Sequence, residues 1–160
     1  MDVRHLESEA FGDLLESILR RVIMTRSEQK RVRFRQVLLR EILAPRATDL
    51  QELFLDLIAE LEEQEVEMLR EYRAAAEIAA QRSEEDSQVP LAGAFRTAEH
   101  FGMDEAAYQI ARDHLGARGL LFDDGMGRWD ASARQFYEIT ELGLAFLRFI
   151  ELPDSPRGTE

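Results

Sequence analysis

The C-terminal fold is specified by two short stretches, LGARGLL at residues 115–121 and YEITELG at residues 137–143. The first closes a run whose apolar residues recur every three or four positions, which predicts a helix. Leu120, Leu121 and Phe122 then form a short apolar run suited to a strand. Alternation over residues 134–139 predicts a second strand, paired with the first as a β-hairpin, and Thr140 is suited to cap a final helix.

A tight turn lies just upstream of this run. We expect residues 91–101 to form a short helix. It should end at Gly102, because glycine is favoured just past a helix C-terminus. Asp104 is suited to cap the next helix, residues 105–118. Two helices joined by a short glycine-containing turn predict a helix-turn-helix.

Residues 91–152 therefore resemble the winged helix-turn-helix superfamily, in particular MarR-like and PadR-like regulators. In those families a leucine and an arginine-glycine-leucine step lead from the recognition helix into the first wing strand, as at Leu115 and residues 118–120 here. A Thr-Glu-x-Gly start of the last helix follows the second wing strand, as at residues 140–143. The resemblance implies that helix 105–118 enters a DNA major groove and that a wing around residues 126–134 approaches the minor groove or phosphates.

This comparison defines the candidate contact residues. Arg112 and Gln109 could read base edges, since Arg suits guanine and Gln suits adenine. Trp129 either anchors a partner from the wing loop or folds back onto the hairpin. The complete set of possible partner or DNA contacts is Glu105, Gln109, Arg112, Arg118, Arg128, Trp129 and Arg134.

Charge argues against DNA as the partner. Residues 88–160 carry seven Arg against twelve Asp and Glu, and Asp113, Asp123, Asp124 and Asp130 fall in or beside the expected contact surfaces. DNA-binding domains usually present a basic patch, because cations neutralise phosphates. We therefore expect an acidic winged helix that contacts protein, with a DNA-binding transcriptional regulator as the alternative.

Residues 1–82 predict a helical arm. Residues 17–46 carry a net charge of +7 and residues 47–87 a net charge of −10. Pro45 separates them, so a basic helix can fold back on one long acidic helix, residues 50–80, as a helical hairpin. We expect the cations of residues 20–40 to pack beside that acidic helix rather than to form a second surface for nucleic acid. Self-association through apolar stripes predicts a homo-oligomer whose interface contains Leu15, Leu19, Val22, Leu53, Leu57, Leu61 and Met68.

Composition limits the remaining possibilities. The chain has 160 residues, 45% apolar, a net charge of −12 and no cysteine, so disulfides and thiolate zinc sites are excluded. No apolar run approaches the ~20 residues of a membrane span. The first five residues lack a signal-peptide pattern, so we expect a cytoplasmic protein with no membrane contact. Lys30 is the only lysine among 20 cationic residues, which fits a GC-rich genome or adaptation to high salt.

The sequence shows no catalytic motif. The three histidines lack metal-ligand spacing, and no glycine-rich loop precedes a helix. We therefore expect no enzyme activity, no metal and no cofactor. The domains are an arm (1–82), a linker (83–90), the winged-helix module (91–152) and a tail (153–160). The expected function is that of a non-catalytic, oligomeric regulatory or adaptor protein. A third possibility is a ligand sensor with a cavity lined by Phe101, Tyr108 and Phe146.

Overall fold

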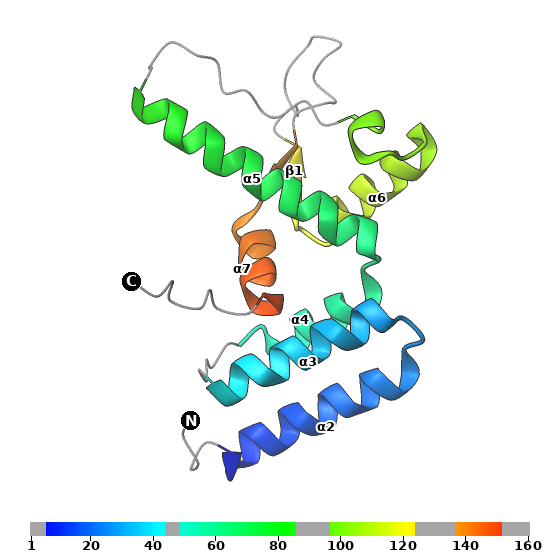
Figure 1. Ribbon diagram of the computed structural model, residues 1–160, viewed down its shortest axis with the longest axis vertical. Helices are drawn as coiled ribbons and strands as arrows, with labels where there is room; N and C mark the ends of the chain where they lie inside the picture. Colours follow the sequence, from blue (N-terminus) through cyan, green and yellow to red (C-terminus); the bar gives the residue numbers. More distant parts are fainter. Residues whose placement is uncertain (1–5, 44–48, 86–96, 124–136, 152–160) are drawn as a thin grey trace, which may run out of the picture. The chain divides into compact units, whose positions relative to one another are not determined.

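The computed structural model describes residues 6–43, 49–85, 97–123 and 137–151 (Figure 1). The described part of the chain is mainly helical and includes a two-stranded antiparallel sheet. It divides into two compact units, Met1–Leu61 with Arg148–Glu160, and Glu62–Leu147. In chain order the elements are α2 (Glu9–Met24), α3 (Glu28–Leu43), α4 (Gln51–Glu60), α5 (Glu63–Glu85), η1 (Glu99–Phe101), α6 (Glu105–Ala117), β1 (Leu121–Asp123), β2 (Tyr137–Ile139) and α7 (Glu141–Ile150).

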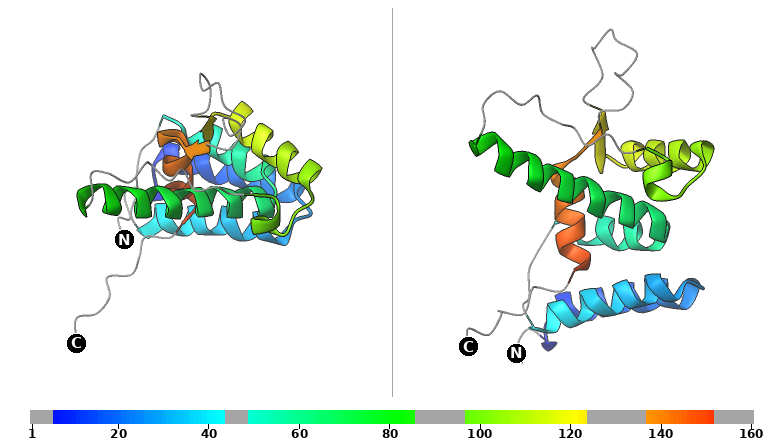
Figure 2. Two further views of the ribbon diagram at one scale, coloured as in Figure 1. Left: turned by 90° about the horizontal axis from the view of Figure 1, so that it is seen from above. Right: turned by 45° about the horizontal axis from the view of Figure 1, so that its top comes forward.

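The first unit begins with a hairpin of two helices. The backbone N–H of Phe11 donates to Ser8 Oγ at 3.2 Å, which caps the start of α2. After α2 ends, Ser27 Oγ accepts from the backbone N–H of Lys30 at 3.3 Å and starts α3. The two helices then run side by side in opposite directions (Figures 1 and 2). A helical hairpin is thus present, but α2 and α3 form it, whereas the sequence predicted one between the basic helix and the acidic helix that follows Pro45.

The core of this unit lies where α4 contacts α2 and α3. The rings of Phe54 and Phe149 pack with their centroids 5.0 Å apart. On α3, Val32 is 44% exposed, whereas the neighbouring Arg33 is buried. The buried apolar side chains of the unit are Leu14, Ile18, Phe34, Val37, Phe54, Leu55, Leu57, Ile58, Leu61, Phe149 and Ile150.

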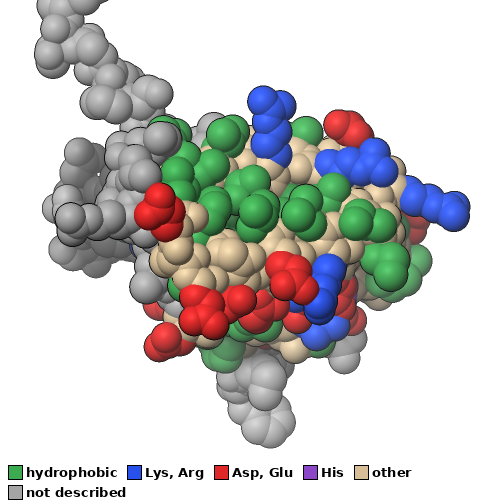
Figure 3. Space-filling view, turned by 90° about the horizontal axis from the view of Figure 1, so that it is seen from below, with side chains coloured by type: hydrophobic (Ala, Val, Ile, Leu, Met, Phe, Trp, Pro, Cys, Tyr) green, Lys and Arg blue, Asp and Glu red, His purple; other side chains and the backbone are tan. Residues whose placement is uncertain are grey.

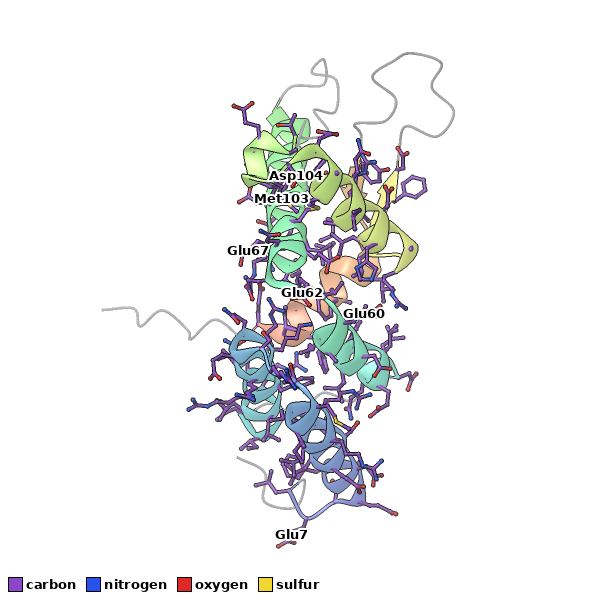
Figure 4. The ribbon with its side chains drawn as sticks, turned by 90° about the vertical axis from the view of Figure 1, so that its right-hand side faces the viewer. Glu7, Glu60, Glu62, Glu67, Met103 and Asp104 are labelled. Carbon is purple, nitrogen blue, oxygen red and sulfur yellow. The ribbon has the colours of Figure 1, made fainter. Side chains whose placement is uncertain are left out.

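The expected single helix over residues 50–80 is wrong, because the chain breaks between α4 and α5. Leu61 has an extended backbone, with ψ at 133°. The backbone N–H of Glu62 donates to Glu65 Oε2 at 2.8 Å, the reciprocal half of a capping box. Figure 4 labels Glu60 and Glu62 at this point. A side-chain cap restarts the helix here without any Gly or Pro.

The second unit contains α5, which contacts both α6 and β2. The strands pair antiparallel, with Leu121 opposite Ile139 and Asp123 opposite Tyr137, so the predicted hairpin pairing is confirmed. The buried apolar side chains are Val66, Met68, Leu69, Tyr72, Ala98, Tyr108, Ala111, Leu115, Leu120, Leu121, Phe146 and Leu147. The second unit therefore starts at Glu62 and includes α5, which the sequence assigned to the helical arm.

Residues 83–85, expected in a linker, form the end of α5, while 86–90 lie outside the described residues. The turn before α6 follows its prediction. Gly102 adopts φ 63°, and Asp104 Oδ1 accepts from the backbone N–H of Ala107 at 2.8 Å (Asp104 is labelled in Figure 4). Of the helix expected over residues 91–101, residues 97–101 are described, and they contain the 3-10 turn η1. Within those residues, no helix combines the length and apolar character that a membrane span requires.

Candidate functional site

The two stretches that specify the C-terminal fold meet at Thr140. Its hydroxyl donates to the carbonyl oxygen of Gly119 at 2.6 Å and lies 3.2 Å from that of Leu120. Its backbone N–H donates to the carbonyl oxygen of Leu120 at 3.1 Å. The hydroxyl also accepts from the backbone N–H of Gly143 at 3.0 Å and so caps α7. One threonine therefore ties the end of α6, the start of β1 and the start of α7 together.

Two glycines are required by this junction. Gly119 adopts φ 70°, a left-handed conformation that favours glycine. A Cβ on Gly143 would lie 2.5 Å from the carbonyl oxygen of Leu120 and 2.8 Å from Cγ1 of Ile139. Both glycines thus occupy positions in the quoted stretches where a side chain is excluded by conformation or by space.

The outer face of α6 is the candidate interaction site. Its inner face buries Tyr108, Ala111 and Leu115. The outer positions recur at spacings of three and four residues and so share one side of the helix. Ile110 is 71% exposed, and Gln109 Nε2 donates to Glu105 Oε1 at 2.9 Å. We define the α6 face as Glu105, Ala106, Gln109, Ile110, Asp113 and Ala117, all of which are exposed.

Arg112, expected on this outer face, packs against two tyrosines instead. Its guanidinium lies 4.7 Å from the ring centroid of Tyr137 and 5.7 Å from that of Tyr108. Its side chain is 16% exposed and pairs with Asp113 at 3.2 Å. Burial opposes its charge, but Tyr137 and Asp113 outweigh burial and raise the pKa of Arg112. Arg112 therefore joins α6 to β2 as a permanent cation.

The other candidate contacts divide between exposed and undescribed residues. Glu105, Gln109 and Arg118 are exposed on or just after α6. Arg128, Trp129 and Arg134 of the expected wing lie outside the described residues. The exposed part of the site thus carries the carboxylates of Glu105 and Asp113, with Arg118 at its C-terminal end.

Three aromatic rings pack beside α6 in the second unit. Phe101 stacks on Tyr108 with centroids 5.8 Å apart, and Tyr72 stacks on Phe101 at 6.4 Å. The hydroxyl oxygens of Tyr72 and Tyr108 lie 3.3 Å apart, and burial with this hydrogen bond raises the pKa of Tyr72. Phe101 and Tyr108, expected to line a cavity with Phe146, therefore contact each other directly.

The structure also brings together Glu65 and His114, a pair that the sequence reading missed. His114 Nδ1 lies 2.5 Å from Glu65 Oε1. The other oxygen of the same carboxylate accepts from the backbone N–H of Glu62. Glu65 is 7% exposed, so a buried carboxylate both caps α5 and contacts α6. The residues are 49 positions apart, and no spacing rule reveals such a contact.

Cations of residues 17–46, the basic part of the sequence, form contacts within the first unit. Lys30 is buried, and its Nζ donates to the carbonyl oxygens of Ala59 at 2.8 Å and Glu60 at 3.2 Å, at the C-terminus of α4. Cations are favoured there because the helix dipole and the last carbonyl groups are negative. Arg21 Nη2 contacts Glu52 at 2.9 Å and Asp56 at 2.5 Å. These contacts support packing beside an acidic helix, as the sequence predicted.

Arg40 repeats this arrangement at the C-terminus of α7. Its Nη1 donates to the carbonyl oxygen of Arg148 at 3.0 Å and to that of Phe149. Its guanidinium also lies 4.4 Å from the centroid of the Phe149 ring. The buried position of this arginine is thus explained by contacts within the first unit.

Burial corrects part of the expected oligomer interface. Leu57, Leu61 and Met68 are at most 1% exposed within the single chain, so they are not available to a second copy. Leu19 and Leu53 are 51% and 41% exposed, and Leu15 and Val22 are half-buried. The exposed apolar surface of the first unit therefore includes α2 and not the core residues of α4.

The described part of the chain contains no group of three His, Asp or Glu side chains arranged to hold a metal ion. Comparison with known proteins finds no matching family model, no similar curated protein and no similar solved structure.

Proposed function

We propose that the protein is a non-catalytic adaptor whose second unit is an acidic winged-helix module that contacts a partner protein through the α6 face. The order α6, β1, β2 and α7, together with the junction at Thr140, supports the winged-helix assignment. The observation that carries the function is the composition of the α6 face. Ile110 is 71% exposed between carboxylates, and the one arginine in the middle of the helix is packed against tyrosines.

Such a face suits a protein partner better than DNA. Glu105 and Asp113 oppose the phosphates that DNA presents, since its affinity comes largely from cations that neutralise them. An exposed isoleucine supplies apolar contact area of the kind found at the centre of protein interfaces. The expected partner surface is therefore basic, with an apolar recess for Ile110.

A photo-crosslinking residue tests this proposal. A chain with p-benzoylphenylalanine in place of Ile110 is irradiated in a cell extract and compared with a matched chain carrying it in place of Ile78, 48% exposed on α5. We expect protein adducts from the Ile110 position that disappear when Asp113 is also changed to Arg. Adducts that nuclease removes and protease leaves, or equal adducts at both positions, would refute the protein-contact proposal.

A DNA-binding regulator is the second candidate, because Gln109 and Arg118 are exposed as this function requires. Its test is titration of mixed-sequence duplex DNA at low salt. The adaptor proposal predicts no saturable binding. Micromolar affinity that falls steeply with salt, and that Arg118→Ala weakens, would favour the regulator. Arg112→Ala is not a clean probe, because it also removes packing against Tyr137.

A further inference from the structure

An exposed apolar band crosses the α2–α3 hairpin. Its side chains follow helical spacing: Leu19 and Ile23 are four residues apart, and Val32, Leu39 and Leu43 are seven and four apart, so each set shares one side of its helix. Ile23 is 80% exposed and Leu43 is 64% exposed. Figure 3 shows apolar side chains gathered on this side of the hairpin. We call Leu19, Ile23, Val32, Leu39 and Leu43 the hairpin band. Contiguous exposed apolar surface marks interaction sites.

The exposed charges around the band are separated along the length of the hairpin. Residues 6–16 contain four exposed carboxylates and no Lys or Arg, and they form the acidic end. The other half of the hairpin, from Arg20 through the turn between α2 and α3 to Arg35, has four exposed arginines and one exposed carboxylate, Glu28. In Figure 3 most cations lie toward the top and right of this face, and most carboxylates lie toward its lower and left parts. The acidic end is Glu7, Glu9, Asp13 and Glu16, and the basic end is Arg20, Arg26, Arg31 and Arg35.

The returning helix does not cancel this separation. Residues 36–43 of α3 lie beside the start of α2, because the two helices run in opposite directions. Their two charged residues, Arg40 and Glu41, are both buried. The exposed surface of the hairpin therefore keeps one acidic end and one basic end.

We propose that the hairpin band is the interface with a second copy of this chain, packed antiparallel about a twofold axis that crosses the hairpin. Such an axis places the acidic end of each copy against the basic end of the other, at both ends of the interface. A parallel arrangement places like charges together, which is repulsive. Burial of Leu19, Ile23 and Leu39 supplies the affinity, and the charges set the orientation.

A second copy fits this surface better than a partner of one charge. A uniformly basic partner is repelled by the arginines of the basic end, and a uniformly acidic partner by the carboxylates of the acidic end. Only a surface with the reverse order of charge satisfies both ends, and the hairpin itself, turned by 180°, has that order. This inference specifies the oligomer interface and does not depend on what the α6 face binds.

The first test is the mass of the full chain by light scattering over a range of concentrations. We expect a dimer of the 18.4 kDa chain. Ile23→Glu is expected to weaken the dimer at least about tenfold, because it buries a charge in the interface. Ile110→Glu is the matched control, an isoleucine of similar exposure (71%) on α6, and it is expected to leave the dimer intact. Circular dichroism verifies that both variants are helical.

A monomeric mass at every concentration overturns the proposal, as does a dimer that Ile23→Glu leaves unchanged. A dimer lost in Ile110→Glu and kept in Ile23→Glu would move the interface to the second unit and likewise overturn it. These outcomes are independent of adducts at Ile110, so the dimer and the adaptor function can fail separately.

The second test is orientation. The chain contains no cysteine, so single cysteines report specific pairs. Chains carrying Asp13→Cys and Arg26→Cys are mixed and treated with a short bis-maleimide, and each chain is also treated alone. The antiparallel dimer predicts crosslinks mainly between the two different chains. Crosslinks mainly within each chain treated alone would place like ends together and overturn the antiparallel arrangement.

Discussion

At the scale of single residues, Gly143 shows why the start of α7 has its sequence. An added Cβ at this position meets the carbonyl oxygen of Leu120 at 2.5 Å, and a backbone atom cannot move aside cheaply. We expect Gly143→Ala to lower the free energy of unfolding by about 1–3 kcal/mol, the range typical of overpacking. Urea denaturation followed by circular dichroism measures this change.

Gly116→Ala is the control for this substitution. Gly116 also lies inside a helix, but its Cβ would meet nothing within 4 Å. Alanine has the higher helix propensity, so we expect this variant to gain up to about 1 kcal/mol. Equal effects of the two substitutions would contradict the close approach of α7 to the carbonyl oxygen of Leu120.

Tyr72 makes the second unit sensitive to alkali. Burial, assisted by the hydrogen bond to Tyr108, raises the pKa of Tyr72 in the folded chain. The unfolded chain loses this proton near the ordinary tyrosine pKa of about 10, whereas the folded chain keeps it. Above that pH the unfolded state binds fewer protons, so the stability of the fold decreases as pH rises.

We expect ionisation of Tyr72 to leave the free energy of unfolding unchanged below about pH 9 and to lower it between about pH 10 and 11. Tyr72→Phe should remove part of this fall, because phenylalanine cannot ionise. Urea denaturation at each pH measures both chains. Identical alkaline slopes in the two chains would show that Tyr72 does not contribute.

At the scale of elements, Glu65 determines how α5 begins. Its carboxylate accepts from the backbone N–H of Glu62 and contacts His114 on α6. Glu65→Ala removes a helix cap and a buried partner together. We expect a loss of about 1–3 kcal/mol in the free energy of unfolding. Glu67→Ala, on the same helix but exposed and paired with Arg70, should change stability by less than about 1 kcal/mol. A loss in Glu67→Ala equal to that in Glu65→Ala would contradict this role.

The elements also show what the sequence could predict. Helix spacing and short-range caps predicted α6, the hairpin strands and Thr140 at the start of α7, because these signals act within a few residues. The break before Glu62 has no Gly or Pro to mark it, and only the three-residue spacing of Glu62 and Glu65, typical of a capping pair, indicates it. The position of Arg112 over Tyr137 joins residues 25 positions apart in sequence, and only tertiary packing determines it.

At the scale of the whole molecule, the net charge of −12 sets a dependence on salt. Self-repulsion among carboxylates destabilises the folded chain, and salt screens it. Exposed pairs such as Arg20 with Glu16 weaken at the same time, but each contributes little. Since acids outnumber bases by 32 to 20, screening of repulsion should dominate.

We therefore expect the midpoint of urea unfolding to rise as NaCl is added and to level off near 0.1–0.2 M, where the Debye length is about 8–10 Å. NaCl is preferred to sulfate, because sulfate strengthens apolar burial in any protein. The protein concentration is held fixed, since the expected dimer also contributes to stability. A plateau would support the interpretation that the high arginine content reflects a GC-rich genome. Lys30 would then be retained because it caps the C-terminus of α4. A midpoint that continues to rise into the molar range would instead support adaptation of the acidic surface to high salt.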